Sequence, residues 1–183
     1  GVIHEAARNG KLQELKDLLA KGTAIESKDQ HEMTPLHYAC LNGREEITGF
    51  LLEEGADAEA KDELYRRPIH CAAYSGSVPV LELLVSRDVD VDPVNWRSQT
   101  PLHVASFQSK EPACEFLVNS GASLNSKDID EKTPVEVAGS LAVRQALQSA
   151  KEKRAKALQA EVDAMFAELR KEVEDGVPTP TKE

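Results

Sequence analysis

Four prolines recur at a constant spacing of 33 residues, and the residues around them recur as well. The four segments are Thr34-Pro35-Leu36-His37, Arg67-Pro68-Ile69-His70, Thr100-Pro101-Leu102-His103 and Thr133-Pro134-Val135-Glu136. A fixed period of this length indicates stacked copies of one supersecondary unit, each of which buries surface only against its neighbours. Such a stack has no enclosed active site by default and presents a long, ridged surface for binding.

One repeat, residues 34–66, shows how the unit is built. The Thr34 hydroxyl suits a helix N-cap, and Pro35 suits the first helical position because that backbone N–H has no helical partner. Apolar residues spaced by three and four then predict a first helix that Gly43 ends and a second helix that Gly55 ends. The rest of the repeat is polar and carries turn residues. The predicted unit is therefore a helix, a turn, a second helix and a long loop.

These residues closely resemble the ankyrin repeat. The matching pieces are Thr34-Pro35-Leu36-His37-Tyr38-Ala39, Gly43, Leu51-Leu52 and Gly55-Ala56-Asp57. The same frame fits five copies over residues 1–149, of which the first and last are atypical or partial. The resemblance implies an all-α repeat solenoid of stacked helix-turn-helix units. It also implies loops that form β-hairpins at right angles to the helices, and a protein-binding role.

Several positions depart from the repeat pattern. Asp88 stands where a second helix is usually followed by glycine, and Ser109 stands where a first helix is. Tyr65 occupies the position at which the hairpin usually has glycine. In the last repeat Glu136 replaces the recurring histidine, and we interpret this repeat as a cap with a more polar outer face.

Composition narrows the function classes. The net charge is −10, which disfavours binding to nucleic acid or to an anionic membrane. No run of about 18 apolar residues exists, so we expect no membrane insertion. Three cysteines without close spacing predict neither a disulfide framework nor a zinc knuckle, and a cytoplasmic or nuclear location fits best.

Neither the histidines nor the cysteines are expected to carry chemistry. The recurring histidines stand one per repeat, and helices roughly 8–10 Å apart cannot bring them to one zinc ion, whose nitrogen ligands lie about 2 Å away. In the ankyrin repeat this histidine makes structural hydrogen bonds near the Thr-Pro turn. The three cysteines read as small buried hydrophobes. We therefore predict no catalytic residue, no metal and no cofactor.

The ankyrin frame implies that the loop tips and the ends of the first helices face the concave side. Large side chains are enriched there, and aromatic, Met and Arg residues are the types that dominate binding hot spots. The predicted partner-binding residues are Met33, Leu41, Leu64, Arg66, Tyr74, Trp96, Arg97, Gln99, Phe107 and Gln108. The alternative for Trp96 is that it folds against its own hairpin and stabilises it.

The charge is concentrated in the repeats. Residues 1–149 hold 15 Lys and Arg against 24 Asp and Glu, a balance of −9. The remaining residues are nearly neutral. A basic or mixed-charge peptide partner would therefore be steered towards the repeats.

Strong helix formers without Pro or Gly extend from about Leu141 to Glu174, and we assign residues 150–175 to a C-terminal amphipathic helix, followed by a tail or linker over 176–183. Its apolar stripe is Leu158, Val162, Met165 and Leu169, which steps by 4, 3 and 4 residues. The favoured interpretation is that this helix folds back and covers the end of the last repeat. Self-association or a partner helix is the alternative.

Together these features predict a non-catalytic protein-interaction scaffold or adaptor. Two alternatives stay open. The segment could be a regulatory or targeting module of a larger enzyme, or a scaffold that forms homo-oligomers through its C-terminal helix.

Overall fold

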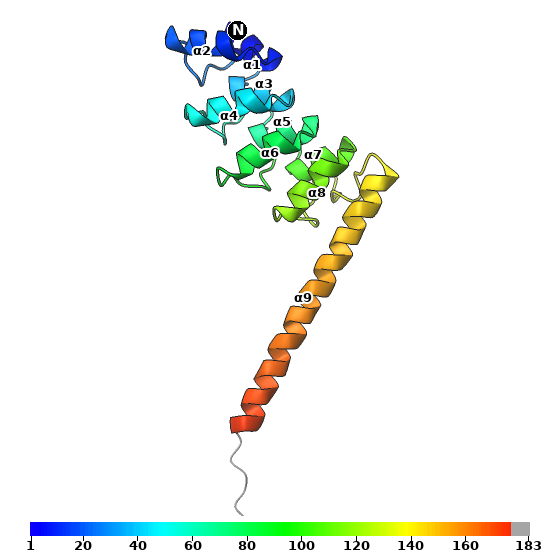
Figure 1. Ribbon diagram of the computed structural model, residues 1–183. Helices are drawn as coiled ribbons and strands as arrows, with labels where there is room; N and C mark the ends of the chain where they lie inside the picture. The colour runs from blue at the N-terminus through cyan, green and yellow to red at the C-terminus, as the bar shows by residue number, and fades with distance from the viewer. Residues whose placement is uncertain (177–183) are drawn as a thin grey trace, which may run out of the picture. The chain divides into compact units, whose positions relative to one another are not determined.

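The computed structural model describes residues 1–176, and that part of the chain is entirely helical apart from its turns and loops (Figure 1). The chain divides into two compact units, Gly1–Leu147 and Gln148–Glu183. The helices of the described part are α1 (Val2–Asn9), α2 (Leu12–Ala20), α3 (Pro35–Leu41), α4 (Glu45–Glu53), α5 (Pro68–Ser75), α6 (Val78–Val85), α7 (Pro101–Phe107), α8 (Glu111–Asn119) and α9 (Leu141–Gly176).

The first unit is a stack of helix pairs, as Figure 1 shows. The first helices form one layer, in which α1 packs on α3, α3 on α5 and α5 on α7. The second helices form the other layer, where α4 packs on α6 and α6 on α8. Leucines such as Leu36, Leu81 and Leu117 are fully buried, and each stabilises the stack by roughly 1.5–3 kcal/mol. The predicted all-α repeat solenoid is confirmed.

The Thr-Pro segments at Thr34 and Thr100 start first helices as predicted. The hydroxyl of Thr34 accepts a hydrogen bond from the His37 backbone N–H, and the Thr100 hydroxyl does the same for His103. In each of these helices the proline takes the first position, where no N–H partner is needed. Arg67 has no hydroxyl at the equivalent position, so α5 begins without this side-chain cap.

The loops differ from the expected β-hairpins. Each tip is a tight turn closed by a backbone hydrogen bond between residues four apart, for example from Asp62 N–H to the Arg66 carbonyl at 3.1 Å. Successive tips are joined by single bonds, such as Trp96 N–H to the Leu64 carbonyl at 3.1 Å. No strand is present among residues 1–176, because one bond between neighbouring tips does not make a ladder.

The substituted glycine positions keep the backbone conformation of glycine. Asp88, with φ of 56°, and Ser109, with φ of 58°, are both left-handed. Tyr65 is left-handed as well, with φ of 57°, at a position where Glu32 and Ser98 have the same conformation in the neighbouring tips. The repeat geometry therefore overrides the local preference against positive φ, which costs a non-glycine residue roughly 1–2 kcal/mol.

The last repeat lacks a first helix. Residues 134–137 form a turn, and α9 begins at Leu141, nine residues before the predicted start of the C-terminal helix at residue 150. Val143 and Leu147, near the start of α9, are buried with 1 % and 2 % exposure. These two side chains complete the core of the first unit, so α9 contributes the second helix of this repeat.

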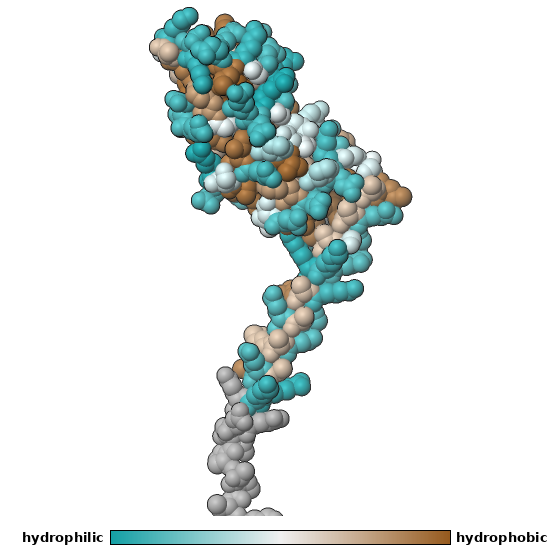
Figure 2. Space-filling view, in the orientation of Figure 1, coloured by the Kyte–Doolittle hydropathy of each residue, from teal (hydrophilic) through white to brown (hydrophobic). Residues whose placement is uncertain are grey.

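The rest of α9 belongs to the second unit and is mostly exposed. Leu158, Met165 and Leu169 expose 62 %, 52 % and 48 % of their surface. Within the second unit taken by itself these side chains are exposed, and the interpretation that they cover the last repeat stays a prediction. Figure 2 shows apolar side chains beside hydrophilic ones along this helix. The predicted tail falls almost wholly on residues 177–183, which lie outside the described part of the chain.

Candidate partner-binding groove

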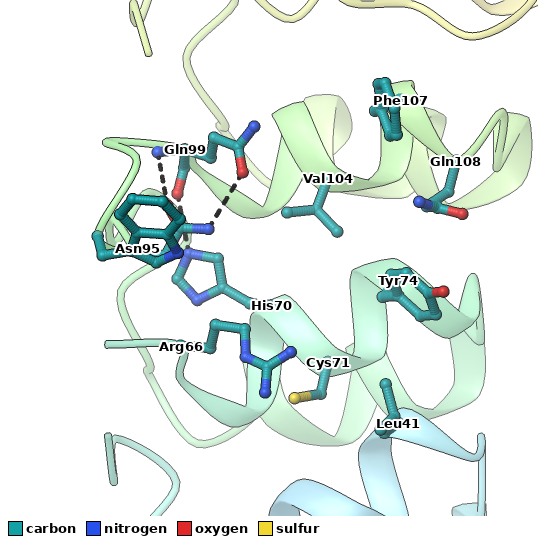
Figure 3. A pocket seen from close by; sticks show the side chains of 11 residues that line it. Leu41, Arg66, His70, Cys71, Tyr74, Asn95, Gln99, Val104, Phe107 and Gln108 are labelled. Atoms are coloured by element: carbon teal, nitrogen blue, oxygen red, sulfur yellow. Dashed lines mark hydrogen bonds between the residues drawn. The ribbon is translucent and has the colours of Figure 1, made fainter. Parts of the chain in front are cut away.

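A hollow of about 430 Å³ opens on the layer of first helices. Seven of the ten predicted partner-binding residues line it: Leu41, Arg66, Tyr74, Trp96, Gln99, Phe107 and Gln108. Four further lining residues were not predicted: His70, Cys71, Asn95 and Val104. We call the hollow formed by these residues the central groove. Figure 3 shows that α5 and α7 form its two sides.

Helical spacing places the apolar part of the central groove. Cys71 and Tyr74 lie three residues apart on α5, and Val104 and Phe107 lie three residues apart on α7, so each pair shares a helix face. The rims are exposed, with 50 % of the Tyr74 surface and 63 % of the Phe107 surface open to solvent. Cys71 is 2 % exposed and forms part of the floor. The unpredicted residues Cys71 and Val104 could have been found from this three-residue spacing.

Trp96 adds a third exposed aromatic side chain at the tip between α6 and α7, with 53 % of its surface open. Its neighbour Arg97 places its guanidinium 5.5 Å from the centre of the Trp96 ring, a cation–π arrangement. Three large aromatic residues from three neighbouring segments thus lie around one hollow. Exposed apolar side chains that cluster in this way are typical of interaction sites, whereas isolated ones are ordinary on protein surfaces.

The polar edge of the central groove is held by its own hydrogen bonds, which Figure 3 shows as dashed lines. The Asn95 side-chain amide donates to the Gln99 side-chain carbonyl at 3.2 Å, and the Asn95 side-chain carbonyl accepts from the Gln99 backbone N–H at 3.0 Å. The His70 ring is bonded through Nε2 to the Gln99 backbone carbonyl at 3.0 Å. Asn95 and His70 are buried, so they fix the tip in place.

Three predicted residues do not line the central groove. Met33 is buried, with 5 % exposure, and its backbone carbonyl lies 3.0 Å from His4 Nε2. Leu64 is 37 % exposed at its tip. Arg97 forms an ion pair with Asp130, with 2.8 Å between Nη2 and the carboxylate oxygen. The structure therefore separates these three from the other seven.

The histidines at the start of the first helices hold successive repeats together. In His37, Nδ1 accepts from the Thr34 backbone N–H at 3.2 Å, while Nε2 lies 3.0 Å from the Arg66 carbonyl of the next tip. Because a carbonyl can only accept, Nε2 carries the proton and the ring is neutral. Burial lowers the pKa of His37 and lowers that of His70 to about 4. These are the structural hydrogen bonds that the resemblance implied.

The thiols have the environment of core residues. All three are buried, and burial raises the pKa of Cys71 and of Cys114 to about 12. Burial also raises the pKa of Cys40 well above its usual range. A thiol in this state is protonated at neutral pH, whereas the thiolate is the nucleophile. Cys71 therefore contributes an apolar surface to the central groove rather than reactivity.

Two further observations concern other kinds of site. Among residues 1–176, no three or more His, Cys, Asp or Glu side chains are grouped so that they could hold a metal ion. Within the same residues, no helix combines the length and the apolar character that crossing a membrane requires.

Comparison with known proteins agrees with the architecture. The family model described as "Ankyrin repeats (3 copies)" matches residues 2–62 and 55–128, which together make up more than half of the chain. No curated protein matches the chain.

Proposed function

This chain belongs to the ankyrin-repeat family, and from that premise we propose that it acts as a non-catalytic scaffold or adaptor that binds a protein partner in the central groove. Ankyrin repeats generally serve as protein–protein interaction modules. The finer assignment, to one surface of this chain, rests on the exposed aromatic side chains of Tyr74, Trp96 and Phe107 around one hollow.

The size of the central groove favours a segment of a partner over a large flat surface. A volume of about 430 Å³ holds a few side chains of a peptide rather than a whole domain face. Aromatic residues supply large contact areas with few rotatable bonds, so they bind with little loss of side-chain entropy. We therefore propose a peptide segment whose large apolar side chains enter the groove.

The charge of the repeats affects the approach of this partner. With a balance of −9 over residues 1–149, long-range attraction favours a basic or mixed-charge segment. This attraction depends on ionic strength, because charges beyond about 8–10 Å are screened at physiological salt. The association rate is thus expected to fall when salt is added, while the apolar contacts persist.

A matched pair of tyrosine variants tests the assignment of the surface. Tyr74→Ala removes a rim of the central groove, whereas Tyr65→Ala removes a tyrosine of similar exposure, 59 %, outside it. Partners captured from cell extract by the wild-type chain should be lost with Tyr74→Ala and retained with Tyr65→Ala. Equal retention by both variants would place the binding surface elsewhere on the stack.

The exposed stripe of α9 favours a second function, self-association. Leu158, Met165, Phe166, Leu169 and Val173 all expose about half of their surface or more. Two such stripes packed together would remove that apolar surface from water. Light scattering should then give a dimer for the intact chain and a monomer for residues 1–150. A monomeric intact chain would leave the scaffold function to the repeats alone.

A further inference from the structure

Arg66 is the one residue charged at neutral pH among the described residues that line the central groove. Two other groups that line it, His70 and Cys71, have pKa values shifted by burial towards the neutral form, to about 4 and about 12. The guanidinium of Arg66 lies beside the Cys71 sulfur in Figure 3. A hollow with apolar walls and one cation favours a ligand that carries both an apolar group and an anionic group.

Asp62 holds the Arg66 guanidinium in place through Nε and is not bonded to its terminal nitrogens. Asp62 has a fully buried side chain, and its carboxylate accepts from Arg66 Nε at 2.7 Å and from the Leu64 and Arg66 backbone N–H groups. Within residues 1–176, the Arg66 terminal nitrogens make one hydrogen-bond contact, from Nη2 to the Met33 sulfur at 3.8 Å. A thioether is a weak acceptor, so the planar fork of the guanidinium keeps donors available.

The other acidic side chain next to this tip has a partner of its own. Glu63 Oε1 lies 2.7 Å from His31 Nδ1 on the preceding tip. Asp62 already accepts three hydrogen bonds, one of them from Arg66 Nε. Glu63 also attracts Arg66 electrostatically, but among the described residues no carboxylate is hydrogen-bonded to the terminal nitrogens, so these can donate to an acceptor on a bound molecule.

We infer that the central groove recognises a partner peptide in which an Asp or Glu side chain stands close to an aromatic or large aliphatic side chain. The carboxylate pairs with the Arg66 fork, and the apolar side chain lies over Cys71 and Val104 between the aromatic rims. Charge-assisted hydrogen bonds to a guanidinium are about twice as strong as neutral ones. Because Asp62 already orders Arg66, less entropy is lost when the pair forms. This inference rests on the proposed function.

The geometry of the groove sets the spacing of the two groups. Tyr74 lies three residues beyond Cys71 on α5, which is about 4.5 Å along the helix. An extended peptide advances about 3.3 Å per residue, so the acidic and apolar side chains stand one to three residues apart. Leu41 of the preceding repeat and Trp96 of the next line the groove on either side of Arg66, so a bound peptide continues past Arg66 in both directions. The carboxylate therefore belongs to an Asp or Glu side chain within the peptide rather than to its C-terminus.

The test uses synthetic peptides and the full chain. The probes are fluorescein-labelled nonapeptides of Gly, Ser and Lys, acetylated and amidated, with one Glu placed one to three residues from one Phe, and twins with Gln in place of Glu. Fluorescence anisotropy should show the best Glu peptide binding about tenfold more tightly than its twin. Arg66→Gln should reduce this ratio to about one. Arg87→Gln, an equal charge change at an exposed arginine outside the groove, should preserve it.

Because Arg66→Gln also removes a bond to Asp62, a melting curve accompanies it. If that variant fails to fold, Arg66→Lys is used in its place. The lysine ammonium cannot form the two parallel hydrogen bonds of a guanidinium, so the affinity ratio of the Glu peptide to its Gln twin should fall to about threefold. An unchanged ratio in the folded Arg66 variant, equal binding of the wild type to both twins, or binding of neither would overturn the inference.

The inferred preference for an acidic side chain would also be overturned if the Gln peptides bound more tightly than the Glu peptides and did so through their Lys side chains. The proposed function is judged separately by Tyr74→Ala. Binding that needs Tyr74 but ignores the Glu side chain refutes the acidic preference alone, whereas binding that is indifferent to Tyr74 refutes the groove itself.

Discussion

At the residue scale, a recurring histidine such as His37 makes one hydrogen bond within its own repeat and another to the next repeat. The His37 and His103 rings bond to the backbone at the start of their own helices through Nδ1 and to the Arg66 and Lys132 carbonyls of the next tips through Nε2. The recurrence of His beside Pro was visible in the sequence. The receiving carbonyl 29 residues away was not, because it depends on how the next repeat stacks.

Removal of one such ring should destabilise the stack. His37→Ala leaves the Arg66 carbonyl without its donor, and we expect the free energy of unfolding to fall by about 1–3 kcal/mol in urea titration. Added zinc should not raise the melting temperature of the wild type, because both ring nitrogens are already bonded. A stoichiometric zinc signal in native mass spectrometry would contradict this role.

The same rings predict a loss of stability in mild acid. Burial places the pKa of His70 at about 4, below its ordinary value of 6.5, and also lowers the pKa of His37 and His103. The unfolded chain therefore binds more protons than the folded chain between about pH 6.5 and 4, so stability is full above 6.5 and falls as the pH drops. Between pH 7.5 and 5 the free energy of unfolding should decrease by at least about 1 kcal/mol.

A variant at His70 supplies the control for this pH dependence. His70→Gln should show a smaller difference in stability between pH 7.5 and 5 than the wild type, because one of the buried rings is gone. Equal stability of the wild type at the two values would show that the buried rings accept protons without loss of packing.

At the scale of elements, the repeat pattern predicted α3, α5 and α7 well because each begins at a Thr-Pro or Arg-Pro step. The end of the stack was predicted less well. α9 begins at Leu141 rather than at residue 150, and the turn over residues 134–137 replaces a helix. Helix-forming residues occupy both the observed range of α9 and the predicted range from residue 150, so helix propensity alone cannot determine where the helix starts. Burial of Val143 and Leu147 in the first unit settles the question.

Leu147 separates the two parts of α9. Leu147→Ala should lower the free energy of unfolding by about 2–5 kcal/mol, since the residue is 2 % exposed and its removal leaves a cavity. Leu158→Ala, at a site 62 % exposed, should change it by less than about 0.5 kcal/mol. Equal losses in urea titration would mean that the stripe of α9 packs as tightly as its first turns.

Two glycines test the packing of neighbouring elements with one kind of substitution. A Cβ at Gly139 would lie 2.3 Å from the Phe107 carbonyl oxygen, whereas a Cβ at Gly49, inside α4, would meet only Leu83 Cδ1 at 3.8 Å. Gly139→Ala should therefore lower the free energy of unfolding by about 1–3 kcal/mol. Gly49→Ala should raise it by about 0.5–1 kcal/mol, because alanine favours a helix interior. Opposite signs in either variant would contradict the packing described.

At the scale of the whole molecule, function depends on side chains that repeats bring together from distant parts of the sequence. The repeat frame predicted seven residues of the central groove, because the ends of first helices and the tips recur at fixed positions. It could not separate Met33, which the stacking buries, from positions that stay open. Nor could it identify Arg66 as the one charged side chain that lines the groove among the described residues, since that depends on which neighbours share the groove.

The most direct test of the account is the affinity of the partner for Trp96→Ala, measured together with the melting temperature of the variant. Trp96 lines the central groove and is 53 % exposed, so its loss should weaken binding by about 2 kcal/mol or more and leave the melting temperature nearly unchanged. A marked fall in melting temperature with intact binding would show that Trp96 stabilises its own tip and that the partner binds elsewhere.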